Sequence, residues 1–134
     1  MVSRKKKTWV YSPPRKPKPK VPDEIKQALQ EKGDEIVEKI FRPEYLEPVP
    51  EQLIINHLMD FYTKWYRNYF YFCSKYKCPS EAYTSSFESK FARIEYIGNN
   101  KFELSYMRHT GQWVQLEIGT MDDCLKSIST MVPY

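Results

Sequence analysis

The first twenty residues hold a dense run of cations, the residue type that binds phosphate. Eight of them are lysine or arginine and none is acidic, whereas the rest of the chain carries 13 basic and 17 acidic residues. Cations on an extended chain displace counterions from DNA or RNA, which gives sequence-independent affinity that falls with salt. The cations are Arg4, Lys5, Lys6, Lys7, Arg15, Lys16, Lys18 and Lys20, and the rings available to stack on bases are Trp9 and Tyr11.

A second set of rings and cations lies in residues 61–76, of which nine are aromatic. A hairpin that turns at Arg67 and Asn68 would sort them by type, as a half-buried sheet does. One face would carry Phe61, Trp65, Phe70 and Phe72, and the other Tyr62, Lys64, Tyr66, Tyr69, Tyr71 and Lys75. A helical stripe also fits these residues, but the hairpin is favoured because aromatic residues crowd out good helix formers here.

The tyrosine and lysine face has two interpretations. Sheets that bind single strands combine rings that stack on bases with cations that hold phosphate, and this face offers both. Alternatively, the N-terminal helix covers the tyrosines and their hydroxyls reach the edge of the sheet. The chain does not contain the glycine and aromatic signature of the common RNA-recognition sheet.

Arg108 and His109, close to Trp113, form the third group. An exposed imidazole beside a guanidinium can bind an anion. The alternative is a structural turn, in which Arg108 pairs with Glu88 or Asp60 and Trp113 packs across from Met107. A metal-free hydrolase would use His109 and Arg108, assisted by Glu88 and Tyr106.

The cysteines favour neither metal nor covalent chemistry. Cys73, Cys78 and Cys124 are an odd number without a secretory context, so reduced thiols are expected. A metal site would need a second cysteine pair or nearby histidines, and the chain has only His57 and His109. Glycine-rich phosphate loops are missing from the sequence as well. We therefore predict no metal and no cofactor.

These residues must be positioned by a small set of elements. Residues 1–20, rich in proline, read as a disordered arm, and residues 21–134 as one globular domain. Apolar residues recur at helical spacing from Ile25 to Phe41, and Arg42-Pro43 is expected to end that helix. After a proline-rich connector and the hairpin, Thr120 and Asp123 predict the start of a short C-terminal helix with an apolar stripe (Met121, Cys124, Leu125 and Ile128).

Residues 91–118 predict a three-stranded antiparallel meander. Three-residue turns at Gly98-Asn99-Asn100 and His109-Thr110-Gly111 would pair apolar residues throughout. The first turn sets Tyr96 opposite Phe102, Ile94 opposite Leu104 and Ala92 opposite Tyr106. The second sets Tyr106 opposite Val114, Leu104 opposite Leu116 and Phe102 opposite Ile118. With the hairpin, the fold class is α+β, with a sheet of four to five strands, a long N-terminal helix and a short C-terminal one.

The strongest run, Phe91 to Trp113, together with residues 62–72 and Trp9 to Pro14, resembles a family of small bacterial proteins known only as a domain of unknown function. The resemblance covers roughly Trp9–Ile128 and implies an intact bacterial domain. It brings no activity and no catalytic residue.

We expect a cytoplasmic protein, since no apolar run approaches the ~20 residues of a membrane-spanning helix. The favoured function is non-catalytic binding of nucleic acid or a ribonucleoprotein through the arm and the aromatic surface, the partner being DNA, RNA or another polyanion. The first alternative is an adaptor whose exposed aromatic patch docks a protein partner. The second is a small hydrolase centred on His109 and Arg108.

Overall fold

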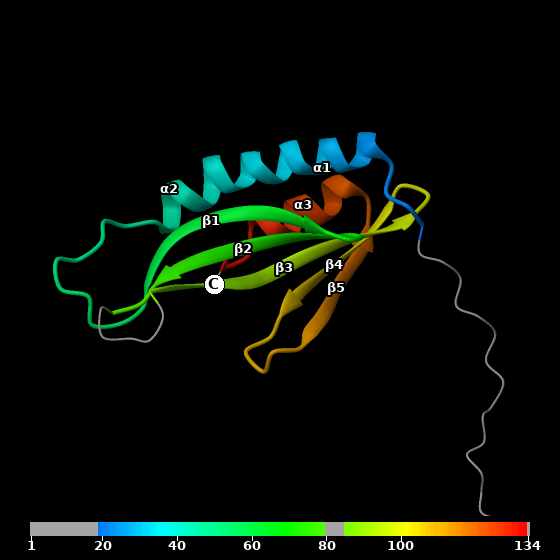
Figure 1. The fold of residues 1–134 in the computed structure, drawn as a ribbon. Helices are drawn as coiled ribbons and strands as arrows, with labels where there is room; N and C mark the ends of the chain where they lie inside the picture. Colours follow the sequence, from blue (N-terminus) through cyan, green and yellow to red (C-terminus); the bar gives the residue numbers. More distant parts are fainter. Residues whose placement is uncertain (1–18, 80–84, 134) are drawn as a thin grey trace, which may run out of the picture.

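The computed structural model describes residues 19–79 and 85–133, and these form an α+β fold. Its sheet has five antiparallel strands in the order of the chain, β1-β2-β3-β4-β5, between an N-terminal and a C-terminal helix (Figure 1). The predicted fold class is therefore confirmed. Residues 1–18 of the arm lie outside the described residues.

The elements follow in simple order. The N-terminal helix consists of α1 (Asp23–Ile36), a π-helical turn (Val37–Phe41) and α2 (Arg42–Tyr45). The strands are β1 (His57–Tyr66), β2 (Tyr69–Lys77), β3 (Ser86–Gly98), β4 (Lys101–Met107) and β5 (Trp113–Gly119). The chain then forms α3 (Met121–Ser129). Among the described residues, no helix is long and apolar enough to cross a membrane.

The N-terminal helix continues past the proline that was expected to end it. Pro43 has no N–H, and in a regular α-helix its ring would clash with the carbonyl of Lys39. A π-helical turn widens the helix just before this point, and the Arg42 N–H bonds to the Val37 carbonyl. The helix therefore ends at Tyr45, and the next residue, Leu46, has an extended backbone.

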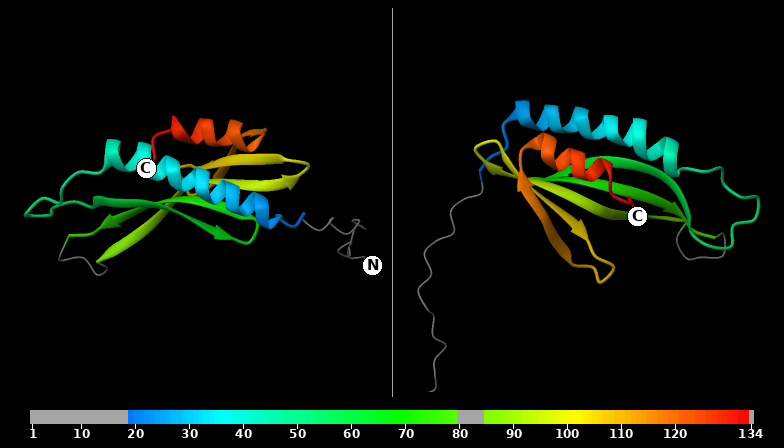
Figure 2. Two further views of the ribbon diagram at one scale, coloured as in Figure 1. Left: turned by 90° about the horizontal axis from the view of Figure 1, so that it is seen from above. Right: turned by 180° about the vertical axis from the view of Figure 1, so that it is seen from behind.

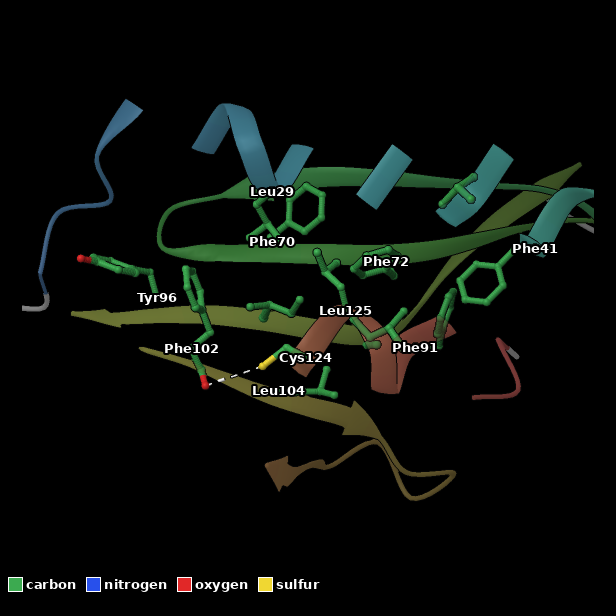
Figure 3. Packing of buried hydrophobic residues seen from close by; sticks show 14 of the residues in the cluster. Leu29, Phe41, Phe70, Phe72, Phe91, Tyr96, Phe102, Leu104, Cys124 and Leu125 are labelled. Carbon is green, nitrogen blue, oxygen red and sulfur yellow. Dashed lines mark hydrogen bonds between the residues drawn. The ribbon is translucent and has the colours of Figure 1, made fainter. Parts of the chain in front are cut away.

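Both helices pack against one face of the sheet, which we call the helix face (Figure 2). Phe70 and Phe72 of β2 project from it toward α1, and α3 adds Cys124 and Leu125 (Figure 3). Gly33 of α1 lies directly over these rings, because a Cβ there would come within 2.6 Å of Phe70. Burial of this aromatic layer removes a large apolar area from water and is the main stabilising contribution of the fold.

Residues 57–77 form the predicted hairpin and not a helix. Tyr66 pairs with Tyr69 across Arg67 and Asn68, and Arg67 has a positive φ of 55°. Phe61, Phe70 and Phe72 are fully buried on the helix face, which confirms how the alternation sorted them.

The predicted register of β3 and β4 is confirmed. Tyr96 pairs with Phe102, Ile94 with Leu104, and Ala92 with Tyr106. The turn is shorter than expected, because Gly98 pairs with Lys101 and an irregularity at Ile97 absorbs the extra residue. Asn99 and Asn100 both have positive φ, 53° and 56°, as a two-residue type I′ turn requires.

The register of β4 and β5 is confirmed only near the turn. Tyr106 pairs with Val114, and the Arg108 N–H bonds to the Gln112 carbonyl around a three-residue loop in which Gly111 has a φ of 86°. Beyond Ser105 the register shifts by one, so Leu104 pairs with Glu117 and Phe102 with Gly119.

The predicted pairs of Leu104 with Leu116 and of Phe102 with Ile118 are therefore wrong. A β-bulge places Leu116 outside the pairing, and Leu116 and Ile118 are 48% and 51% exposed. The bulge turns Glu117 toward α3, where the Ser127 hydroxyl donates to its carboxylate.

The predicted start of α3 is confirmed. The Thr120 hydroxyl accepts a bond from the Asp123 N–H at 3.2 Å, and the Asp123 carboxylate accepts one from the Thr120 N–H at 3.1 Å. Such a capping box satisfies backbone N–H groups at the helix start. Gly119 leaves room for the carboxylate, because a Cβ there would lie 2.8 Å from Asp123 Oδ2.

Candidate functional site

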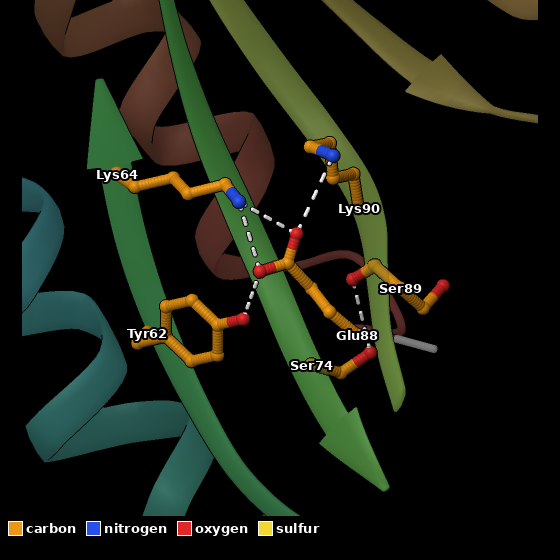
Figure 4. A network of polar contacts seen from close by, with 6 residues as sticks. All are labelled: Tyr62, Lys64, Ser74, Glu88, Ser89 and Lys90. Atoms are coloured by element: carbon orange, nitrogen blue, oxygen red, sulfur yellow. Dashed lines mark hydrogen bonds and ion pairs between the residues drawn. The ribbon is translucent and has the colours of Figure 1, made fainter. Parts of the chain in front are cut away.

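The face of the sheet opposite the helices, which we call the outer face, carries rings and cations. Directly paired residues of antiparallel strands point to the same side. Pairing of Lys64 with Tyr71, Tyr71 with Arg93, and Arg93 with Ser105 therefore defines one row across β1 to β4. None of the described helices packs on this side, and in Figure 4, which views the network on this face, α3 lies behind the strands.

The N-terminal helix does not cover the tyrosines, so that interpretation is wrong. Its contacts are with the opposite side of β1: Gln30 and Asp34 of α1 hydrogen-bond to Thr63. Thr63 lies between Tyr62 and Lys64 in the strand, so its side chain points away from theirs. The polar ends of the tyrosines are left on the outer face.

Arg93 is the centre of a ladder of rings. Its guanidinium carbon lies 4.3 Å from the ring centroid of Tyr69 and 4.4 Å from that of Trp113. The Tyr71 ring lies 5.8 Å from Trp113 and 5.9 Å from Tyr69, centroid to centroid. Cation–π attraction at this range holds the guanidinium and the rings together. We call these four residues of β2, β3 and β5 the ring ladder.

Glu88 of β3 gathers the polar groups beside the ladder. Lys64 Nζ lies 2.7 and 2.9 Å from its two carboxylate oxygens, Lys90 Nζ lies 3.3 Å from Oε1, and the Tyr62 hydroxyl donates to Oε2 (Figure 4). Lys90 also lies over the Tyr71 ring at 5.6 Å. One carboxylate therefore neutralises part of the positive charge of two lysines on the outer face.

The pKa values of this network follow from burial and hydrogen bonding. Burial would raise the pKa of Glu88, but the hydrogen bonds from Lys64, Tyr62 and Lys90 lower it below its ordinary value. Burial, followed by the hydrogen bond to Glu88, raises the pKa of Tyr62. Near neutral pH, Glu88 is therefore charged and Tyr62 is a neutral donor.

The predicted residues differ in how accessible they are. Tyr66 is 56% exposed and Lys75 is exposed, whereas Tyr62, Lys64 and Tyr69 are half-buried. Tyr71 is only 8% exposed, because its neighbours in the ladder cover it. Tyr71 is thus less available to a ligand than the half-buried Tyr69.

Most of the predicted arm residues lie outside the described residues: Arg4, Lys5, Lys6, Lys7, Trp9, Tyr11, Arg15, Lys16 and Lys18. The described part begins with Pro19 and Lys20, and Lys20 is exposed. Asn68 Nδ2 donates to the Pro19 carbonyl at 3.1 Å, and Val21 is buried. The arm is thereby joined to the fold at the β1–β2 turn, next to Tyr66 and Tyr69.

Arg108 and His109 lie beyond the end of β4, in the loop before β5, and both are exposed. The predicted ion pair of Arg108 is not formed, since Glu88 bonds to lysines and Asp60 bonds to Arg42 at 2.9 Å. Met107 does pair with Trp113, as expected. The four residues of the hydrolase alternative, Glu88, Tyr106, Arg108 and His109, line one groove.

Sequence reasoning missed Arg93 and Lys90 as members of the site. A signal existed for Arg93, because it alternates with the core residues Ala92 and Ile94. For Lys90 there was none. A β-bulge at Phe91 reverses the alternation, so that Lys90 lies opposite Cys73 on the outer face while Phe91 stays in the core.

All three cysteines are buried. Cys73, Cys78 and Cys124 form no disulfide with one another. Burial raises the pKa of Cys73 to about 12 and that of Cys124 to about 11, so both stay protonated at neutral pH. Within residues 19–79 and 85–133, no three histidine, cysteine or acidic residues cluster in a way that could hold a metal ion.

Comparison with known proteins identifies one family. Residues 19–131 match the model of a family described as Domain of unknown function (DUF3024). No curated protein and no solved structure matches the chain. The matched span includes the whole sheet and all the helices, and it starts after residues 1–18 of the arm.

Proposed function

We propose that the chain, which belongs to this family of unknown function, binds single-stranded nucleic acid on the outer face. The family gives no activity, so the proposal rests on the residues of that face. The ring ladder and the lysines beside it would bind the strand, and the cationic arm would add sequence-independent attraction. No catalytic step is part of the proposal.

One observation carries the proposal: Tyr69, Arg93 and Trp113 are stacked on an open sheet face. A base has a π-face and a phosphate has negative charge, so a strand needs rings and cations that alternate over a few ångströms. The outer face provides this alternation across β2, β3 and β5. Base stacking on rings is largely independent of sequence, so the proposal implies no preference for one base.

The arm supports the proposal through its place of attachment. Its last described residues contact the β1–β2 turn, at the end of the sheet where Tyr66 and Tyr69 lie. Seven of its eight cations precede residue 19. A strand on the outer face would therefore lie near the C-terminal end of the cationic segment. The adaptor and hydrolase alternatives stay predictions. A hydrolase, unlike a protein that only binds the strand, would cleave the oligonucleotide.

The test is a titration of a fluorescent oligothymidine at low salt, monitored by fluorescence anisotropy. Removal of one stacking ring costs ~1–3 kcal/mol. We therefore expect Tyr69→Ala and Trp113→Ala to weaken binding by about 5- to 100-fold. Lys39→Gln, on the exposed side of the N-terminal helix, is the control, because it removes one positive charge far from the rings.

The proposal would be rejected if folded Tyr69→Ala and Trp113→Ala proteins bound the oligonucleotide like the wild type. Circular dichroism and thermal unfolding establish that each variant is folded. An equal loss of affinity in the Lys39→Gln protein would also contradict the proposal, because net charge alone would then account for binding. Cleavage of the oligonucleotide that is lost in His109→Ala would favour the hydrolase instead.

A further inference from the structure

A groove opens where β4 separates from β3. The strand β3 pairs with β2 from Ser86 to Glu95, but its pairing with β4 begins only at Ala92. The segment from Ser86 to Phe91 thus has a strand partner on one side only among the described residues. The space beside it is a groove of about 920 Å³, bounded by the β4–β5 loop and the segment that follows α3.

The groove combines an apolar floor with a basic rim. Phe91, Tyr106, Met107 and Met131 provide apolar surface, whereas Lys90, Arg108 and His109 are basic. Arg108 is exposed and, among the described residues, has no carboxylate within ion-pairing distance. A guanidinium offers a planar set of donors that matches a phosphate. This is the pattern of a site for a ligand with a flat apolar part and an anionic group.

The groove is continuous with the outer face. Glu88 and Lys90 belong to the network beside the ring ladder, and both also line the groove. A strand that lies on the ladder can therefore continue into the groove without leaving the protein surface.

We propose that the groove is a nucleotide site. The base packs on Tyr106, Met107 and Met131, and Arg108 binds the phosphate with support from Lys90. The inference rests on the proposed function in that this nucleotide would belong to the bound strand. The groove itself is complete without the ladder, so a free mononucleotide also tests it.

A nucleotide fits the groove better than an acidic peptide does. The exposed edge of β3 offers backbone groups to an added strand, as peptide-binding sheets do. However, Glu88 stands in the middle of that edge and would repel acidic side chains. The basic groups lie mainly on the opposite rim, beside the aromatic and methionine side chains. A ligand with one phosphate next to one flat ring matches this arrangement of basic and apolar side chains.

The experiment follows backbone amide resonances of the full chain as adenosine 5′-monophosphate is added. We expect shifts in the amides of Met107, Arg108 and His109, and smaller shifts with adenosine or inorganic phosphate alone. Hydrogen bonds to a charged group contribute ~1.5–3 kcal/mol, so Arg108→Gln should weaken binding by about 10- to 100-fold. Arg67→Gln is the matched control, since Arg67 is an exposed arginine in the β1–β2 turn that does not line the groove.

The inference would be overturned if millimolar mononucleotide left these amides unshifted, or if Arg108→Gln and Arg67→Gln behaved alike. Shifts produced by hexaglutamate and not by the mononucleotide would replace it with a peptide site. The two proposals fail separately. Mononucleotide shifts in the groove without oligothymidine binding would refute only the ladder, and oligothymidine binding without groove shifts would refute only the groove.

Discussion

At the scale of single residues, Glu88 controls the charge of the outer face. Its carboxylate holds Lys64 and Lys90 at 2.7 and 3.3 Å, so these lysines are partly neutralised before any ligand arrives. Phosphates of a bound strand would have to compete with this carboxylate. Glu88 is therefore expected to stabilise the fold and to weaken the binding of anions. One substitution should change the two properties in opposite directions.

We predict that Glu88→Gln binds oligothymidine more tightly and unfolds more easily. Exposed ion pairs contribute ~0.2–1 kcal/mol, so freeing the lysines should tighten binding by up to about fivefold. The measurement is fluorescence anisotropy together with urea unfolding. Glu35→Gln is the control, because Glu35 pairs with Lys39 on the helix, away from the outer face.

The pH dependence of this effect has a definite sign. The folded-state pKa of Glu88 is lowered, so the stability it contributes is present above its unfolded pKa and is lost as pH falls through the folded value. Protonation of Glu88 over the same range releases Lys64 and Lys90. The difference in affinity between wild type and Glu88→Gln should therefore shrink as pH falls toward the folded pKa. A difference that is constant with pH would contradict the competition.

At the scale of elements, the contact between α1 and β2 fixes which face of the sheet stays open. Gly33 lets the helix backbone approach Phe70 and Phe72 closely. A larger residue would lift α1 from the sheet or force the rings out of their positions. Close packing of α1 on the helix face thus depends on the missing side chain at Gly33.

Gly33→Ala should destabilise the protein even though alanine favours helix. The added Cβ would lie 2.6 and 2.8 Å from two ring atoms of Phe70, and overpacking of this kind costs ~1–3 kcal/mol. The gain in helix propensity is ~1 kcal/mol, so the expected net loss in unfolding free energy is up to about 2 kcal/mol. Glu31→Ala, on the exposed side of the same helix, should change stability little, and equal effects of the two variants would contradict close packing at Gly33.

The elements also show how far local patterns predict structure. Alternation of Phe with Tyr and Lys predicted the β1–β2 hairpin and its faces, because alternation reports directly which side chains are buried. The extension of the helix through Pro43 and the bulge at Leu116 were not predicted. Each inserts one residue into a regular repeat, and contacts with other elements hold the irregular backbone. Arg42 bonds to Asp60 of β1, and the Ser127 hydroxyl of α3 donates to Glu117.

At the scale of the whole molecule, charge is separated between the arm and the domain. The first twenty residues carry eight cations, whereas the rest of the chain has an excess of four acidic residues. Such a chain is not uniformly basic, and any polyanion that it binds is expected to be attracted to its N-terminal end. The outer face, partly neutralised by Glu88, would supply contact and the arm would supply attraction.

Deletion of residues 1–18 should weaken oligothymidine binding and reduce its dependence on salt. The deletion removes seven cations. Each phosphate that they neutralise contributes ~0.7 to the slope of log K against log salt for a single strand, so the slope should fall by up to about 5. Tyr69→Ala should weaken binding of the shortened chain by the same factor as in the full chain. An unchanged slope would show that the arm takes no part in binding.

Residue order alone specified the cationic segment, the presence of the three hairpins and the capped C-terminal helix, because charge, alternation and turn chemistry act between neighbours in the chain. It gave neither the two-residue turn at Asn99-Asn100 nor the register of β4 with β5 beyond Ser105. It did not specify that Arg93 would stack on Tyr69 and Trp113, that Lys90 would share Glu88 with Lys64, or that a groove would open beside β3. Each of these features joins residues of different elements. A single bulge reverses which side chains share a face, and packing between distant segments determines where a bulge forms.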